Sequence, residues 1–565
     1  MIHHKMFALL LIAVTLGLSG SVASAGIVNT KHNLSATGPG TVKAPSESEV
    51  CIFCHTPHNS SPTVPLWNRN LPVLNYTPYS SSTMQSSPGQ PTHASKLCLS
   101  CHDGTIALGS VLSRPTPISV SGSLSNKANL GTNLSDDHPV SFAYDSALAA
   151  KNTELVNPAL LTGSVHLDSH GQLQCTTCHD PHSDTYSKFL VVDGSNGALC
   201  TKCHTKSGWT GSAHATSIAT WNGMGTTPWP HTTWTTVAAN GCENCHAPHA
   251  AGTAKELLNY STEEGNCLPC HNGNVDRKNI SNEVAKPYRH SSSAYFQVHD
   301  PVENFSMMAR HVECQDCHNP HAAVAGTATA PNVSGPLTKV AGVTMAGTRT
   351  ANSNYQYEVC LRCHADNANV PAPNIARVIL QPNIRLKLQT TNPSFHPVLG
   401  PRNNTEVTSL ISPWTSSSWV YCTDCHNNDS GPGAGGTGPR GPHGSTWRYL
   451  LERQYLTADN TTESVQAYAL CYKCHDRAKI LGDQTFRYHN KHIVGERAPC
   501  SACHDAHGIS STQGNATNNS NLINFDKTIV LKETSTQRLE FRDTGVRRGQ
   551  CYLLCHGEAH NPYSY

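Results

Sequence analysis

The chain has 565 residues, of which 37% are hydrophobic and 6% aromatic, and its formal net charge is +1. With 41 Gly and 35 Pro in addition, it buries too little apolar surface to offset its ordering entropy, which excludes a globular domain with an ordinary hydrophobic core. Something other than protein must fill the interior.

The N-terminus predicts export. Lys5 precedes an apolar run at residues 6–18, and Ala23-Ser24-Ala25 before Gly26 has the small-residue form of a cleavage site. Residues 1–25 therefore read as a secretory signal peptide, because the apolar run is too short to span a bilayer. No later segment is apolar enough to cross a membrane, so we expect no membrane span. The predicted location is extracellular or on the outer surface, otherwise periplasmic.

All 24 Cys fall into pairs that are followed by His. Eleven motifs are Cys-x-x-Cys-His and the last is Cys-x-x-x-Cys-His. They are Cys51/Cys54/His55, Cys98/Cys101/His102, Cys175/Cys178/His179, Cys200/Cys203/His204, Cys242/Cys245/His246, Cys267/Cys270/His271, Cys314/Cys317/His318, Cys360/Cys363/His364, Cys422/Cys425/His426, Cys471/Cys474/His475, Cys500/Cys503/His504 and Cys551/Cys555/His556.

The Cys-x-x-Cys-His run is the attachment signal for a c-type haem, and the His that follows becomes the proximal iron ligand. A single motif could instead be a zinc half-site or a redox dithiol. Twelve motifs that use every Cys favour twelve covalently attached haem c groups. We expect a haem at Cys551 and Cys555 as well, because two thiols would otherwise remain free in an oxidising compartment.

A second His follows five of the twelve motifs at short range. In Cys175-Thr-Thr-Cys-His-Asp-Pro-His182, three residues span at most about 10 Å, so His182 cannot easily reach the far face of the haem held by His179. It is better placed to bind a neighbouring iron. The downstream His residues of this kind are His58, His182, His249, His321 and His507, and His443 takes this role after a Gly-rich insertion at residues 431–441.

Each pair of motifs also has His residues upstream. The candidates are His32, His138 or His170, His214 or His231, His290 or His311, His396, and His489 or His492. His93, His166, His299 and His560 are left open, and His560 has the strongest claim because it closely follows the irregular last motif. Met is scarce, so bis-His, low-spin haems of low potential are predicted.

The alternation of motif types divides the chain into six di-haem repeats after the signal peptide. They cover residues 26–160, 161–225, 226–285, 286–385, 386–480 and 481–565. Short helices should lead into the motifs, for example at 462–474, and segments 522–531 and 538–542 read as a hairpin. The predicted fold is an irregular one, mostly coil with short helices and a few strands wrapped around a stacked haem chain.

Several stretches resemble a known family. They are the paired motifs with CHTPH, CHDPH, CHAPH and CHNPH, the early Lys31-His32-Asn-Leu-Ser, the Asp137-His138-Pro-Val-Ser-Phe stretch and the closing CHG…HNPYSY. The chain is similar to extracellular multihaem c-type cytochromes of metal-reducing bacteria that have doubled Cys-x-x-Cys-His repeats. The resemblance implies transfer of respiratory electrons to minerals, electrodes, redox partner cytochromes or partner cells, and some members assemble into filaments.

Together these features predict a dodecahaem electron conduit with no catalytic residues. Haem propionates would add about 24 negative charges, so nucleic acid is not an expected partner. The alternative is a multihaem reductase of nitrite, hydroxylamine or a similar substrate, which needs an open iron position. A homopolymeric filament is compatible with the first reading.

Overall fold

The computed structural model describes residues 26–61, 66–125, 127–290, 299–301, 303–401 and 407–565, so the predicted signal peptide lies outside the described residues. The chain divides into two compact units. The first comprises Met1–Thr205 and His246–Leu258, and the second Lys206–Cys245 and Asn259–Tyr565. The division into six di-haem repeats stays a prediction. Across the described residues, no helix has the length and apolar character needed to cross a membrane.

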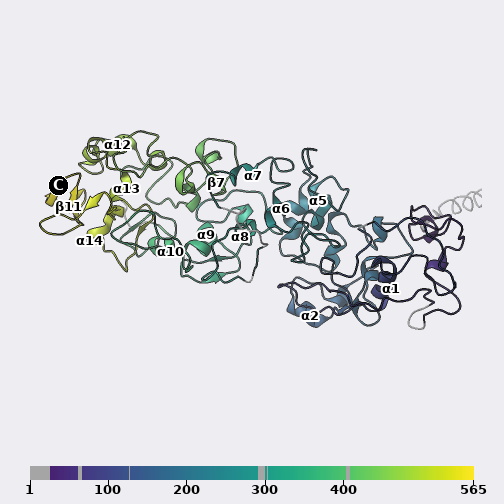
Figure 1. Cartoon of the computed structure of the whole chain (residues 1–565). Coiled ribbons are helices and arrows are strands. Elements are labelled where there is room, and N and C mark those ends of the chain that lie inside the picture. The colour runs from purple at the N-terminus through teal and green to yellow at the C-terminus, as the bar shows by residue number, and fades with distance from the viewer. Residues whose placement is uncertain (1–25, 62–65, 126, 291–298, 302, 402–406) are drawn as a thin grey trace, which may run out of the picture. The chain divides into compact units, whose positions relative to one another are not determined.

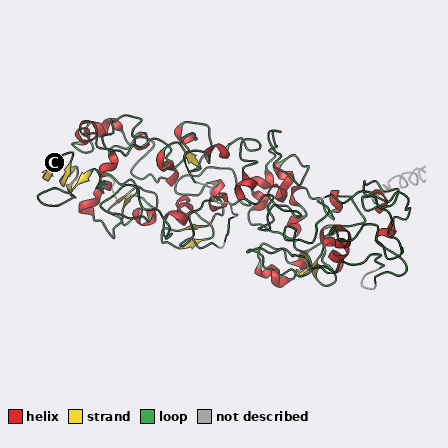
Figure 2. Ribbon diagram, in the orientation of Figure 1, coloured by secondary structure: helices red, strands yellow, loops and turns green. Residues whose placement is uncertain are grey.

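Most of the chain is loop, with short helices and small antiparallel sheets, as the fold class predicts (Figure 2). The first unit contains helices α1 (His93–His102), α2 (Ser146–Lys151) and α3 (Cys175–Cys178), strands β1 (Phe142–Ala143) and β2 (Gln172–Leu173), and the 3-10 turns η1 (Ile27–Asn29), η2 (Cys51–Phe53), η3 (Pro158–Leu160), η4 (Ser187–Phe189), η5 (Ser195–Gly197) and η6 (Cys200–Lys202).

The second unit has the same character (Figure 1). Its helices are α4 (Ala213–Thr216), α5 (Val237–Asn240), α6 (Glu263–Cys267), α7 (Ile280–Glu283), α8 (Cys314–Cys317), α9 (Gln356–His364), α10 (Ile384–Lys387), α11 (Ala469–Tyr472), α12 (Arg477–Leu481), α13 (Cys500–Cys503) and α14 (Ala516–Asn519). Its 3-10 turns are η7 (Trp209–Gly211), η8 (Gly241–Asn244), η10 (Gly335–Leu337), η11 (Cys422–Asp424), η12 (Pro432–Ala434), η13 (Arg448–Leu450) and η15 (Ser520–Leu522), and η14 (Lys491–Gly495) is a π-helical turn. Its strands are β3 (Tyr288–Arg289), β4 (Gly342–Val343), β5 (Arg349–Thr350), β6 (Ser394–Phe395), β7 (Gly444–Ser445), β8 (Gly508–Ile509), β9 (Val530–Leu531), β10 (Glu540–Gly545), β11 (Arg548–Cys555) and β12 (Glu558–Ser564).

Two of the predicted elements differ in the structure. The helix expected at 462–474 is confined to the single turn α11. The hairpin expected between 522–531 and 538–542 is wrong, because β9 and β10 each pair with β11 and not with one another. Strand β11 carries the last cysteine pair, and its extended conformation was not predicted. Both β9 and β10 form their backbone hydrogen bonds with β11.

Two small sheets bring distant His residues together. Strand β3 immediately precedes His290 and pairs with β7, which immediately follows His443. Strand β6 likewise precedes His396 and pairs with β8, which follows His507. In both cases the antiparallel ladder holds an upstream His beside the downstream His of the next repeat.

The apolar core is divided into small clusters. One contains Phe305, Tyr357 and Leu361 in the second unit, and another contains Ala502, Phe525 and Phe541 near the C-terminus. Attachment cysteines pack against the rim of these clusters: Cys363 and Cys422 against the first, and Cys503, Cys551 and Cys555 against the second. The cysteine sulfur atoms therefore lie at the edges of the apolar clusters.

Candidate haem sites

A single helical turn presents the two cysteines of many motifs. Helices α3, α8 and α13 each run from one motif Cys to the other, and the 3-10 turns η2, η6 and η11 begin at the first Cys. Residues three apart on a helical turn project to the same side, so both sulfurs point one way. The next residue returns to extended backbone, with φ of −123° at His179, −127° at His318 and −103° at His504.

Many of the motif imidazoles are held through Nδ1. His179 Nδ1 donates to the carbonyl of Lys188 at 2.9 Å, and His426 and His504 donate in the same way to Tyr449 and Asn521, each at 2.9 Å. A hydrogen bond at Nδ1 fixes the tautomer and leaves the Nε2 lone pair free for a metal. The motif His residues are thus oriented as ligands.

The residues that supply these carbonyls were missed by sequence reasoning. Lys188, Tyr449 and Asn521 have left-handed backbone, with φ of 63°, 64° and 54°, and Glu256, which accepts from His246, has φ of 57°. Such conformations cost a non-glycine residue about 1–3 kcal/mol and persist where the surroundings require them. No residue type marks these turns, because Lys, Tyr, Asn and Glu all occur in them.

A second imidazole faces many motif imidazoles with ring centres 6.0–6.4 Å apart. Two metal–nitrogen bonds of about 2 Å each, one to either ring, place the ring centres roughly 6 Å apart. The facing pairs are His32–His102, His55–His182, His138–His204, His179–His249, His214–His271, His290–His364, His318–His443, His426–His507 and His489–His504. This spacing fits an iron ion held between two imidazoles.

The pairs follow a rule. An upstream His faces the second motif of the motif pair that it precedes, as His138 faces His204 at 6.3 Å. A downstream His faces the first motif of the preceding repeat, as His182 faces His55 at 6.2 Å. His443, which lies beyond the Gly-rich insertion, faces His318 at 6.0 Å and so occupies a downstream position.

The residue before a downstream His orients an upstream His. His32 Nδ1 donates to the carbonyl of Pro181 at 3.0 Å, and His214 Nδ1 donates to Pro320 at 2.9 Å. His396 Nδ1 bonds in the same way to Ala506. One short segment therefore carries one imidazole and positions another.

Burial keeps these imidazoles neutral. It is the main cause that lowers the pKa of His179 and His364 to about 4 and the pKa of His443 and His507 to about 3. Neutral imidazole is the form that binds a metal.

Successive motifs lie next to each other within each unit. The Cys98 thiol hydrogen bonds to that of Cys175, which raises the pKa of Cys98. The Cys471 thiol contacts Cys500 in the same way. The same contact joins Cys267 to Cys314 and Cys360 to Cys422. In a haem-bearing protein these sulfurs are thioethers, so the contacts mark neighbouring attachment sites in chain order.

Buried arginines brace the motifs. The Arg69 side chain is 0% exposed and donates to the carbonyls of Leu108 at 2.6 Å and of Ser100 and Ala107 at 3.0 Å. Arg377 in the second unit donates to the carbonyls of Ser501, Asn524 and His504. These guanidinium groups fix the backbone around the cysteine pairs.

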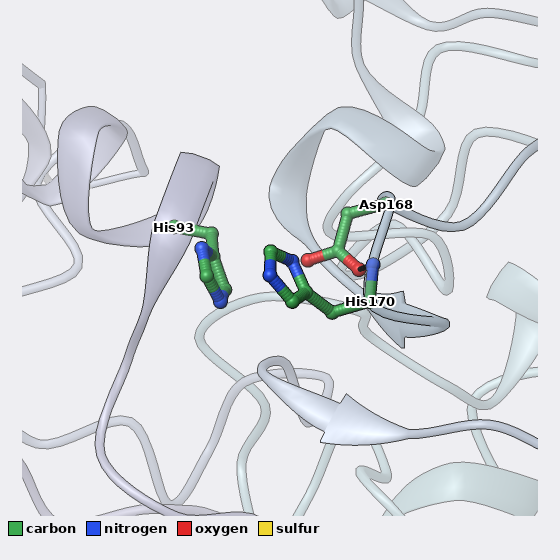
Figure 3. Close-up of side chains that lie close together, drawn as sticks. All are labelled: His93, Asp168 and His170. Atoms are coloured by element: carbon green, nitrogen blue, oxygen red, sulfur yellow. Dashed lines mark hydrogen bonds between the residues drawn. The ribbon is translucent and has the colours of Figure 1, made fainter. Parts of the chain in front are cut away.

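His93 and His170 lie side by side, with Asp168 next to His170 (Figure 3). Their rings stack on each other at 4.2 Å, and Asp168 lies beside His170. The rings are nearly parallel, so their in-plane lone pairs do not converge on one ion. The Asp168 carboxylate accepts from the backbone amides of His170 and Gln172 at 2.8 Å. We interpret the group as a stabilised turn, and His138 occupies the place opposite His204.

The other predicted residues are distributed as follows. His299 lies 3.2 Å from Asp316 and His311 lies 3.1 Å from Glu303, and His58 and His166 are exposed. His214 faces His271, the position for which His231 was the alternative. His475 Nδ1 lies 2.8 Å from Ser409 Oγ, His321 meets the edge of Trp209 at 6.3 Å, and His492 faces His560 at 6.4 Å. Nothing in these contacts tests iron ligation itself, which stays a prediction.

Comparison with known proteins agrees with the motif reading. A family model described as "Doubled CXXCH motif" matches residues 168–208 and 235–276. No curated protein matches the chain. The doubled motifs indicate a multihaem cytochrome c that carries covalently bound haem c and takes part in electron transfer.

Proposed function

We propose that the chain is a dodecahaem electron conduit in which every cysteine pair carries a haem and every iron is held between two His. The observation that carries this proposal is the recurrent facing of a motif imidazole by a second imidazole at 6.0–6.4 Å. Haem c supplies a one-electron ferric/ferrous couple. The protein residues close both axial positions, so little ligand rearrangement accompanies a change of charge.

The contacts between motifs support transfer along the chain. In the first unit Cys98 and Cys175 join the second motif to the third, and Cys54 of the first motif lies near enough to Cys101 of the second to interact with it electrostatically. In the second unit Cys471 and Cys500 join the tenth to the eleventh. We propose that electrons enter near one end of this series and leave near the other.

A reductase of nitrite, hydroxylamine or a similar substrate is the alternative. It requires an iron with one axial position open to substrate, with acid–base groups nearby. The facing imidazoles argue against such a site at the motifs where they occur. We therefore propose an electron carrier without catalytic residues.

We further propose that the protein works outside the cytoplasm, at or beyond the outer surface, and passes electrons to partner cytochromes or extracellular acceptors. Assembly into a homopolymer is part of this proposal. Its support is His58, a downstream His in the first predicted repeat that is exposed to solvent and can meet an iron of a second chain.

The haem content and spin state of the purified full-length protein test the function. A pyridine haemochrome assay should give twelve haems for the 24 Cys. Electron paramagnetic resonance of the oxidised protein should show low-spin ferric iron. Far fewer haems, or a substantial high-spin fraction in the wild-type protein, would argue against a bis-His conduit.

A further inference from the structure

The last motif has a different local structure from the others. Cys551 and Cys555 lie on strand β11, where residues four apart share a face but are separated by about 13 Å. Cysteines at the two ends of one helical turn, as in α3, are only about 5 Å apart. The last pair therefore presents its sulfurs along a strand.

His556 lies in the turn of a hairpin. Cys555 pairs with Glu558, which leaves His556 and Gly557 as the two loop residues, with φ of 48° and 84°. Positive φ at both positions is the signature of a type I′ turn, which connects twisted antiparallel strands. The motif His residues that follow helical turns have φ between −103° and −127° instead.

The hydrogen bonding of His556 is also inverted. Its Nε2 lies 2.9 Å from Asp459 Oδ1 and 3.2 Å from Asp459 Oδ2. Nε2 is the atom that the Nδ1 bonds of His179, His426 and His504 leave free for a metal. At His556 this atom is engaged by a carboxylate.

His560, unlike His556, lies on a strand beside the two cysteines. It lies on β12 directly opposite Leu553, which is flanked on its own face of β11 by Cys551 and Cys555. Directly paired residues of an antiparallel sheet project to the same side, so His560 shares that face with both cysteines.

His560 also faces another imidazole. Its ring centre is 6.4 Å from that of His492, at an interplanar angle of 40°. His492 donates from Nδ1 to the carbonyl of Tyr488 at 2.7 Å, so its Nε2 is free. His560 Nδ1 is buried, and the described residues offer it no hydrogen-bond partner. The two rings border a hollow of about 60 Å³, which Tyr488, Lys491, Glu558 and Tyr563 also line.

We infer that His492 and His560 are the axial ligands of the haem attached at the last cysteine pair, and that His556 instead fastens the hairpin to Asp459. This inference rests on the proposed function, because it requires a haem at Cys551 or Cys555. The proximal ligand is then the fifth residue after the second cysteine, in place of the first.

The test compares His560→Ala with His556→Gly in the full-length, haem-loaded protein, and glycine suits the positive φ of the turn. His560→Ala should convert one haem per chain to high spin in the oxidised protein, bind one carbon monoxide per chain when reduced, and return to low spin on addition of imidazole. His556→Gly should leave the low-spin signal unchanged. One new high-spin haem in His556→Gly, with none in His560→Ala, would overturn the inference.

Two further measurements guard against misfolding and separate this inference from the proposed function. His492→Ala changes a different element and should also open one haem; an unchanged spectrum would contradict the assignment. Mass spectrometry of the C-terminal peptide should show a haem adduct. A bare peptide there, with haem on the other motifs, would overturn the ligand assignment and reduce the haem count to eleven, but would leave electron transfer through the other haems as proposed. Haem missing from all motifs would overturn both.

Discussion

Replacing His507 by Met should shift the potential of a single haem. His507 faces His426 at 6.0 Å with ring planes only 1° apart, and burial is the main cause that lowers its pKa to about 3. A thioether favours ferrous over ferric iron relative to imidazole, so the potential should rise. If the ratio of the ligand's affinity for ferrous iron to its affinity for ferric iron increases more than tenfold, the reduction potential rises by more than about 60 mV.

The size of the affected fraction follows from the sequence. With 24 Cys and two for each haem, the variant should move one haem equivalent out of twelve in a spectroelectrochemical titration. The angle between two imidazole planes sets the splitting of the iron d orbitals. The paramagnetic spectrum should therefore lose a component from a nearly coplanar pair and keep those from steep pairs such as His214–His271 at 86°.

The matched control is His166→Met. His166 is exposed and donates from Nδ1 to the carbonyl of Ser164 at 3.0 Å, so its replacement should leave the titration unchanged. If His507→Met gives the wild-type curve, or if it shifts several haems equally, His507 does not bind one iron opposite His426 and the pairing argument fails.

Three other substitutions test separate parts of the structure. Arg69→Leu removes the donor to the buried carbonyl of Ser100 and to the partly buried carbonyls of Leu108 and Ala107. It should destabilise the first unit by about 1–3 kcal/mol in urea unfolding, which is the cost of one unsatisfied buried group. Burial acts to raise the pKa of Asp505, but Lys387, whose Nζ lies 2.6 Å away, outweighs it and the pKa is lowered. A carboxyl group whose pKa is lower in the folded than in the unfolded protein stabilises the fold above its unfolded pKa, and this stabilisation is lost as the pH falls through its folded pKa. Lys387→Met should therefore cost about 3–5 kcal/mol of stability at neutral pH and less in acid. His170→Gln should leave all haems low-spin, because its ring stacks on His93 and faces no motif imidazole; a new high-spin signal would contradict this placement.

The spacing along the chain could predict that downstream His residues face motif imidazoles, and the structure places His182, His249, His443 and His507 in that way. Three residues limit how far His182 can reach from His179, and the structure places it opposite His55. Choosing between His138 and His170 was a different problem. Both lie upstream of the same motif, and only the fold decides which one meets His204.

The carbonyls that accept hydrogen bonds from the motif imidazoles could not be predicted for a physical reason. Lys188 and Tyr449 adopt left-handed backbone although neither residue type favours it. Their conformations are imposed by the short bridges that join His179 to Leu190 and His426 to Leu451. Glycine would have marked such turns in the sequence.

The exchange of ligands between repeats explains why the sixth predicted repeat departs from the rule. In the first, second, fourth and fifth repeats the first motif is faced by a His from the following repeat, as His426 is by His507. In the sixth, His504 is faced by His489, which comes from the same repeat. Its second motif then needs another ligand, and His492, three residues later, turns toward His560. On the proposed assignment, His489 and His492 would complete both sites of this repeat from within. The extended strand β11 would then let His560 take the ligand role that a helical motif gives to the residue after its second cysteine.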